Sequence, residues 1–341
     1  MDKNLRSGGQ VLVDQLIHQG VTDAFCVPGE SYLAVLDALY LKRDLISLYV
    51  ARQDGGAAFM AEAYGKATGK PGICFVTRGP GATNASIGVH TAFQDSTPMI
   101  LFIGQVGGDM VDREAFQEID YRRMFGQMTK WVTQIDRAER IPEYVARAFQ
   151  IACSGRPGPV VLALPEDMLI ESVDVTDAQK VVCAKNRPTA KSIKEVQVLF
   201  EQSKKPLVIL GGSGWSERAC ELVKTFAENN QLPVGCSFRR QDLFDNHHSN
   251  YVGDIGIGIN PRLADMVKES DLLLVLGARL GEMTTSGYTL VEAPTPKQRL
   301  IHIHPGLEEL GRVFQGSVLI NSDIEEAIDA LVSMPAMVPN W

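Results

Sequence analysis

The chain has 341 residues, 45% hydrophobic and 22% charged, which is the balance of a globular protein with room for two domains. Its net charge of −8 comes without basic clusters or an RNA-binding motif, so we expect small-molecule partners and no nucleic acid. No apolar stretch approaches the length of a membrane span and the N-terminus lacks the apolar core of a signal peptide, so we expect a cytoplasmic protein without membrane contact.

The beginning of the chain alternates predicted helices and strands. Apolar residues at helical spacing predict a helix over 10–19. The apolar run 24–27 predicts a short buried strand, and Pro28 and Gly29 then lead into an amphipathic helix that ends near residue 39. A strand, a tight turn and a helix in succession form the unit from which parallel sheets are built.

The stretch over 52–84 carries the strongest signal in the chain. Small residues predict a helix over 56–68, and an apolar run predicts a strand over 73–76. A Gly-Pro-Gly turn at 79–81 follows this strand and opens another helix at Thr83. Both helices therefore begin after a turn whose glycines let a ligand approach the backbone closely.

Two polar side chains stand at these turns. Asp54 supplies a carboxylate, and the amide of Asn84 offers both a donor and an acceptor, which suits an uncharged heteroaromatic ring. Taken alone, the same residues also fit a purely structural interpretation, in which Asp54 caps a helix beginning at Gly55.

The rest of the first half continues the same alternation. Strands are predicted over 98–103 and 160–164, a helix over 141–153, and a polar loop around 115–120. This rhythm predicts an α/β fold in which a doubly wound parallel sheet is covered by helices on both faces.

Weak periodicity over 171–192 indicates a linker, after which a second α/β domain follows. Its strand at 206–210 runs into the turn 211–215, Gly-Gly-Ser-Gly-Trp, an incomplete dinucleotide-binding signature that is a weak signal by itself. Further strands are predicted over 232–236, 272–276 and 300–303.

The cysteines and histidines predict no metal or disulfide chemistry. The six cysteines lack any C-x-x-C pair, so we expect reduced, structural thiols. His302 and His304 share one face of a strand without a third ligand at a suitable spacing, and we interpret them as structural.

The stretch Arg52 to Asn84 as a whole resembles the thiamine-diphosphate enzymes of the acetolactate synthase type. Their N-terminal pyrimidine-binding (PYR) domain has Arg-His-Glu-Gln, then Gly-Ala-Ala-Phe-Met-Ala-Glu, then Gly-Pro-Gly-Ala-Thr-Asn. Here the corresponding residues are Arg-Gln-Asp-Gly, Gly-Ala-Ala-Phe-Met-Ala-Glu and Gly-Pro-Gly-Ala-Thr-Asn. The second domain is similar to the central domain of that family, which binds FAD in some members.

The resemblance implies a role for seven residues. Asp54 stands at the family's catalytic Glu, which hydrogen-bonds a pyrimidine ring nitrogen, and Gln117 belongs to a Phe-Gln pair at the cofactor and substrate. The implied cofactor-binding residues are Pro28, Gly29, Pro80, Asn84 and Phe116. An alternative alignment would place the catalytic residue at Gln53, but the spacing to Phe116 and Gln117 favours Asp54.

The resemblance also implies the domain plan and the partners. We expect a PYR domain over 1–172, a linker over 173–191 and a Rossmann-like central domain over 192–335. The family holds Mg²⁺ and the cofactor's diphosphate in a further PP domain with a Gly-Asp-Gly motif, of which Gly253-Asp254-Ile255-Gly256 is only a near match. We therefore expect a homodimer, a PP-bearing partner chain, or both.

Three functions remain open at this point. The first is a thiamine-diphosphate-dependent lyase or carboligase acting on 2-oxo acids, although Glu166 stands where acetolactate synthases tend to carry Lys. The second is a non-catalytic module or diverged pseudoenzyme that binds thiamine diphosphate or a nucleotide. The third is a flavoprotein that uses FAD in the second domain alone.

Overall fold

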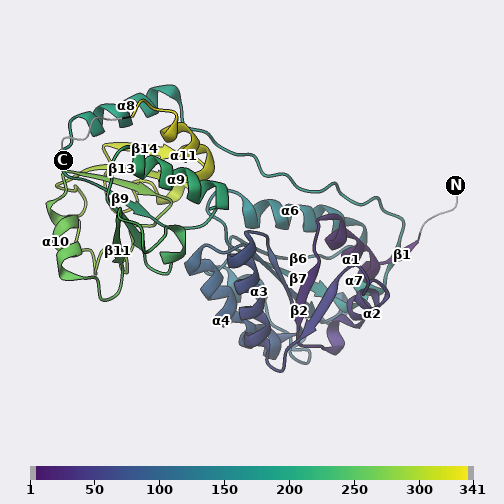
Figure 1. The fold of residues 1–341 in the computed structure, drawn as a ribbon. Coiled ribbons are helices and arrows are strands. Elements are labelled where there is room, and N and C mark those ends of the chain that lie inside the picture. Colours follow the sequence, from purple (N-terminus) through teal and green to yellow (C-terminus); the bar gives the residue numbers. More distant parts are fainter. Residues whose placement is uncertain (1–4, 337–341) are drawn as a thin grey trace. The chain divides into compact units, whose positions relative to one another are not determined.

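The computed structural model describes residues 5–336 and divides into two compact units, with unit 1 ending at Cys183 and unit 2 beginning at Ala184 (Figure 1). The division falls inside the predicted linker 173–191, and the first four residues of the predicted first domain lie outside the described residues. Each unit holds a six-stranded parallel sheet with helices, which confirms the predicted fold class of two doubly wound α/β domains.

The sheet of unit 1 has the strand order β3-β2-β4-β5-β7-β6, and every neighbouring pair in it is parallel. Its strands are β2 (Asp23–Cys26), β3 (Ser47–Val50), β4 (Gly72–Val76), β5 (Met99–Gln105), β6 (Trp131–Gln134) and β7 (Pro159–Pro165). Its helices are α1 (Gly8–His18), η1 (Glu30–Tyr32), α2 (Leu33–Leu41), α3 (Asp54–Thr68), α4 (Gly79–Asp95), η2 (Gly108–Met110), α5 (Tyr121–Phe125), η3 (Ala138–Arg140), α6 (Ile141–Cys153) and α7 (Glu166–Ile170). A short antiparallel pair, β1 (Arg6–Ser7) with β8 (Ser172–Val173), joins the two ends of the unit.

Helices cover both faces of this sheet because consecutive strand residues point to opposite sides. On β4, Ile73 and Phe75 belong to one buried cluster with residues of α1, α2 and α6, while Cys74 and Val76 belong to another with residues of α3 and α4. The second cluster is rich in alanine, and α3 and α4 pack so closely that a Cβ on Gly88 would lie 2.6 Å from the Cβ of Ala58.

The sheet of unit 2 has the order β11-β10-β9-β12-β13-β14 and is also parallel throughout. Its strands are β9 (Pro206–Leu210), β10 (Val234–Ser237), β11 (Tyr251–Ile255), β12 (Leu272–Leu276), β13 (Arg299–His304) and β14 (Val318–Asn321). Its helices are α8 (Ala190–Glu201), α9 (Glu217–Asn229), η4 (Gln241–Leu243), α10 (Pro261–Glu269), η5 (Leu307–Glu309) and α11 (Ile324–Val332). Two buried clusters again lie on opposite faces of the sheet.

The structure differs from the sequence prediction at one helix that bears on the site. Helix α4 begins at Gly79, with Pro80 in its first turn, and not at Thr83. Proline is favoured there because the first N–H groups of a helix have no intrahelical partner, so the missing N–H costs nothing. The Gly-Pro-Gly sequence is therefore the first turn of the helix itself.

Within residues 5–336, no helix combines the length and the apolar character needed to cross a membrane.

Candidate functional site

The candidate site of unit 1 lies at the carboxyl ends of its parallel strands. These ends share one edge of the sheet, so the turns after β2, β4 and β7 gather there. Pro28 and Gly29 follow β2, Arg78 to Gly81 follow β4, and Glu166 follows β7.

Asp54 is the first residue of α3, and Gln53 is the cap of that helix. The side chain of Gln53 accepts a hydrogen bond of 2.8 Å from the Gly56 amide. The alternative in which Asp54 caps a helix starting at Gly55 is therefore wrong, because the neighbouring glutamine already performs that function.

The carboxylate of Asp54 is buried and only half satisfied. The residue is 8% exposed, and its Oδ2 accepts a hydrogen bond of 3.3 Å from Nδ2 of Asn84 on α4. Its Oδ1 is also buried, and no hydrogen-bond partner for it exists among the described residues. A buried carboxylate oxygen without a donor is costly, so this atom marks a position that a donor from outside could fill.

Glycines bring the turns close to this carboxylate. A Cβ on Gly81 would lie 3.2 Å from Oδ1 of Asp54, so the first turn of α4 touches the acid directly. A Cβ on Gly29 would lie 2.5 Å from the Cβ of Thr77, so only glycine lets the turn after β2 pass the end of β4. Pro28 and Pro80 stand beside these glycines and are exposed.

The loop with the predicted Phe-Gln pair is tied to the same turn by its backbone. The amide of Gly79 donates to the carbonyl of Gln117 over 3.0 Å, and Nη1 of Arg78 donates to the carbonyl of Phe116 over 3.3 Å. Gln117 has a left-handed φ of 65°, which a non-glycine residue adopts only when its surroundings hold it there. The Phe116 side chain is 77% exposed.

An ion pair that the sequence did not predict joins two strand ends. Nη2 of Arg78 lies 2.7 Å from Oε2 of Glu166. The Nε of Arg78 is buried and has no hydrogen-bond partner among the described residues. The sequence drew attention to Glu166 as a departure from the family, but it gave no signal that Arg78 would face it.

The groups beneath the turns are neutral at physiological pH. Burial raises the pKa of the Tyr32 hydroxyl, and the charge of Asp54 adds to this effect. Tyr32 donates to the carbonyl of Val27, which fixes the end of β2. Tyr32 is therefore a neutral, hydrogen-bonded side chain beneath the turn after β2.

Unit 1 has a cavity of about 520 Å³ between the loop around 111–120 and the ends of β5, β6 and β7. The hydroxyl of Tyr121 borders it and has no hydrogen-bond partner among the described residues. Burial raises the pKa of this hydroxyl. The loop is closed by Glu118, whose carboxylate accepts hydrogen bonds from the amides of Asp112 and Ala115.

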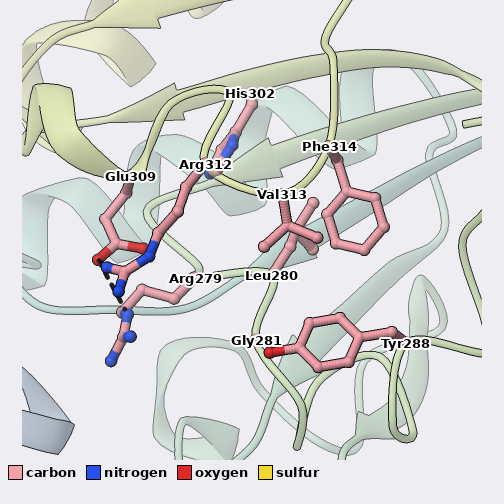
Figure 2. A pocket seen from close by; sticks show the side chains of 9 residues that line it. All are labelled: Arg279, Leu280, Gly281, Tyr288, His302, Glu309, Arg312, Val313 and Phe314. Carbon is pink, nitrogen blue, oxygen red and sulfur yellow. Dashed lines mark hydrogen bonds and ion pairs between the residues drawn. The ribbon is translucent and has the colours of Figure 1, made fainter. Parts of the chain in front are cut away.

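Unit 2 has a smaller cavity, of about 100 Å³, at the ends of β12 and β13 (Figure 2). Glu309 lies 3.3 Å from Nε of Arg279 and 3.1 Å from Nη1 of Arg312. His302 is buried, and its Nε2 bonds to the carbonyl of Ala278 over 2.9 Å. Burial lowers the pKa of His302 to about 4, so the ring is neutral, as its structural interpretation requires.

Two carbonyls of the glycine-rich turn of unit 2 are bonded to side chains of the same unit. Arg240 donates to the carbonyl of Gly212, and Nε1 of Trp215 donates to the carbonyl of Gly211 over 2.8 Å. A dinucleotide binds such a turn through backbone N–H groups, which contact its phosphates. Gly214 of this turn is exposed, and a Cβ there would meet nothing within 4 Å.

The structure shows no metal site in residues 5–336, because no three His, Cys, Asp or Glu side chains gather there as ligands. Asp254, in the near match to the family's metal motif, lies at the end of β11. Burial raises the pKa of its carboxyl.

Comparisons with known proteins agree with this arrangement. The model of the N-terminal TPP binding domain of thiamine pyrophosphate enzymes matches residues 6–124, and the model of their central domain matches residues 193–331. The chain is 30% identical over 325 residues to the acetolactate synthase isozyme 2 large subunit of Escherichia coli, covering 95% of this chain and 58% of that protein. It is 31% identical to a probable acetolactate synthase large subunit of Methanocaldococcus jannaschii (97% and 56% covered) and 33% identical to acetolactate synthase 2 of Nicotiana tabacum (96% and 50% covered). The chain thus spans little more than half the length of these relatives.

Proposed function

Because this chain belongs to the thiamine pyrophosphate enzymes, we propose that it forms the pyrimidine-binding and central parts of an acetolactate-synthase-like enzyme that acts on 2-oxo acids. The proposal covers a lyase or carboligase reaction. The cellular location that we propose is the cytoplasm.

The observation that carries the proposal is the open Oδ1 of Asp54. A pyrimidine ring nitrogen that bears a proton would supply the missing hydrogen bond, and the buried position would make that bond strong. Glycine at 29 and 81 lets the two turns pack against Thr77 and Asp54, where any side chain would collide, so the backbone of both turns lies close to the carboxylate that the ring would meet. The residues present therefore fit the pyrimidine end of thiamine diphosphate.

When bound, thiamine diphosphate supplies the electron sink for bond cleavage or formation beside the carbonyl of a 2-oxo acid. Asp54 has the role of holding a proton at the ring nitrogen, and Asn84 keeps the carboxylate in position through its hydrogen bond to Oδ2. Pro28 and Pro80 line the ring. Phe116 and Gln117 face the reacting end of the site, from a loop that Arg78 and Gly79 hold in place.

The diphosphate end of the cofactor needs a partner in this proposal. Mg²⁺ requires several oxygen ligands, and residues 5–336 gather no such set. We propose that the PP domain of another, PP-bearing family member supplies them, and that this chain also forms a homodimer. Exposed large apolar side chains on unit 1 support such an interface: Leu33, Tyr40, Leu41, Leu45, Val50 and Ile87.

The test is calorimetry of the full chain with thiamine diphosphate and Mg²⁺, with and without a family member that carries a PP domain. We expect weak or no binding to the chain alone and tight, Mg²⁺-dependent binding to the assembly. Submicromolar binding by the chain alone would contradict the need for a partner.

A flavoprotein is the competing function, and it makes a different prediction. A purified protein with flavin absorbance and no response to thiamine diphosphate would replace the proposal.

A further inference from the structure

The segment 174–183, called the strap below, is held on unit 1 by two buried glutamines, one in α1 and one at its C-cap. Gln15 and Gln19 stand one helical turn apart and face the strap. Gln15 donates to the carbonyl of Ala178 over 3.1 Å and accepts from its amide over 2.8 Å. Gln19 likewise donates to the carbonyl of Gln179 over 3.0 Å and accepts from the amide of Val181 over 2.9 Å.

Each glutamine therefore makes the two hydrogen bonds that a neighbouring strand would make to the strap. Its side-chain amide donates to one backbone carbonyl of the strap and accepts from one backbone N–H. Because both side chains are buried, removing them would leave unpaired groups inside the unit. The predicted linker is thus an ordered part of unit 1 as far as Cys183.

The end of the strap brings two thiols together. Cys183 is its last residue, and its Sγ accepts a hydrogen bond of 3.7 Å from the hydroxyl of Ser154. Cys153 is the last residue of α6 and directly precedes Ser154. Both cysteines border one cavity of about 170 Å³ in unit 1 and are half-buried.

We propose that Cys153 and Cys183 are a redox modification site, which a low-molecular-weight disulfide such as oxidised glutathione converts into a reversible intramolecular disulfide. The two thiols are neighbours, because both border the same cavity and the residue after Cys153 donates a hydrogen bond to the sulfur of Cys183. The product fastens the strap to the end of α6.

The reaction proceeds by two thiol–disulfide exchanges. The thiolate of Cys183 attacks one sulfur of the small disulfide, forms a mixed disulfide and releases one small thiol. Cys153 then loses its proton and attacks the sulfur of Cys183, which releases the second small thiol. Two protein thiols are oxidised, and one small disulfide is reduced to two thiols.

The order of attack follows from the surroundings of the two thiols. Burial raises the pKa of Cys153 to about 12, so this thiol is protonated at neutral pH and is a poor first nucleophile. Lys130 opposes this shift, and it is a charge that favours the Cys153 thiolate in the second step. Cys183 is therefore the residue that meets the oxidant.

The test is oxidation of the folded chain with oxidised glutathione, followed by alkylation of free thiols, trypsin digestion and mass spectrometry. Lys180 separates the two cysteines, so trypsin leaves them on different peptides and a disulfide appears as a linked pair. We expect this linked pair as the main product, reversal by dithiothreitol, and slower hydrogen exchange at the strap amides after oxidation.

Two variants and one condition serve as controls. Cys183→Ser should abolish the linked pair, whereas Cys220→Ser, which alters a half-buried thiol of unit 2, should leave it unchanged. In urea the linked pair should form at least several-fold more slowly, because the strap no longer holds the thiols together. Glutathione adducts without the linked pair, or equal rates in folded and unfolded chains, would overturn the proposal.

Discussion

The two sheets of this chain treat a buried ionisable side chain at their strand ends in opposite ways. In unit 1, Asp54 keeps its Oδ1 without a hydrogen-bond partner among the described residues. In unit 2, His302 is buried to a similar degree, yet its Nε2 is satisfied by the carbonyl of Ala278 and the ring is neutral. The same α/β architecture thus provides an open polar group in one unit and a closed one in the other.

The turns beside these residues differ in the same sense. In unit 1, glycine at 29 and 81 lets the turns pack against Thr77 and Asp54 without giving Oδ1 a partner, whereas in unit 2 Arg240 and Trp215 bond to two carbonyls of the glycine turn. An unsatisfied buried group lowers stability and persists where a ligand will complete it. The comparison therefore assigns ligand binding to unit 1, and four predictions test it, beginning with the largest effect.

The largest effect is expected at Asp54. Asp54→Asn keeps the shape of the side chain but removes the charge that holds a proton at the ring nitrogen. In an assembly with a PP-bearing partner, turnover should fall by about 10² to 10⁴-fold, the usual contribution of an acid–base group. Steady-state rates of the Asn and Ala variants measure this.

The stability of the same variants separates function from folding. Because Oδ1 contributes no hydrogen bond in the free chain, Asp54→Asn should change the free energy of unfolding by no more than about 1 kcal/mol. Asp54→Glu is the matched variant that retains the charge, and it should be more active than the Asn variant. Equal rates for all three variants would remove Asp54 from the mechanism.

The second prediction concerns pH and the closed group of unit 2. The pKa of His302 falls from 6.5 to about 4 on folding, so the unfolded chain takes up its proton first as the pH decreases. The stability that depends on neutral His302 is therefore complete above pH 6.5 and is lost between pH 6.5 and about 4, by about 3 kcal/mol.

Chemical unfolding between pH 7 and pH 4 measures this loss, and His302→Gln provides the control. Glutamine can still donate to Ala278 but does not titrate, so its stability should depend less on pH by the same amount. If both proteins show the same pH dependence, His302 is not the group responsible.

The sequence predicted the central strands well and the edge strands poorly. β4, β5, β9 and β12 are buried along their whole length, so each appears as an uninterrupted apolar run. The four strands at the sheet edges are mixed in burial and lack such a run: β3, β6, β11 and β14. None of these four strands was predicted from the sequence.

The candidate site likewise contains one contact within a recognisable stretch and one that the sequence did not predict. Asp54 and Asn84 stand in one recognisable stretch, and the structure brings them within hydrogen-bonding distance. Arg78 and Glu166 are 88 positions apart, and only the pairing of β4 and β7 with β5 brings their ends together. No local pattern reports contacts of this kind, because they depend on strand order.

The third prediction tests the close packing of the turn after β2 in unit 1. Gly29→Ala places a Cβ 2.5 Å from the Cβ of Thr77, so the turn must shift, and the free energy of unfolding should fall by about 2 kcal/mol. Gly56→Ala is the matched control, because its Cβ would meet nothing within 4 Å inside α3, and it should stabilise by about 0.5 to 1 kcal/mol. Urea unfolding shows whether each variant is less or more stable than the original chain. A Gly29→Ala protein as stable as the original chain would show that the turn has room for the added Cβ.

The smallest effect is expected at the ion pair between Arg78 and Glu166. Glu166 is partly exposed, so solvent screens the pair and its coupling energy should be only about 0.5 to 1 kcal/mol. Its influence on the site should nevertheless exceed this figure, because Arg78 also binds the carbonyl of Phe116 and so holds the loop that carries Gln117.

A double-mutant cycle with Arg78→Met and Glu166→Gln measures the coupling by unfolding, while hydrogen exchange of residues 115–118 reports on the loop. We expect faster exchange in the Arg78 variant than in the Glu166 variant, since only the former loses the contact with the loop. Equal exchange in both would mean that the bond from Gly79 to Gln117 holds the loop unaided, and that the open site of unit 1 owes its shape to the backbone alone.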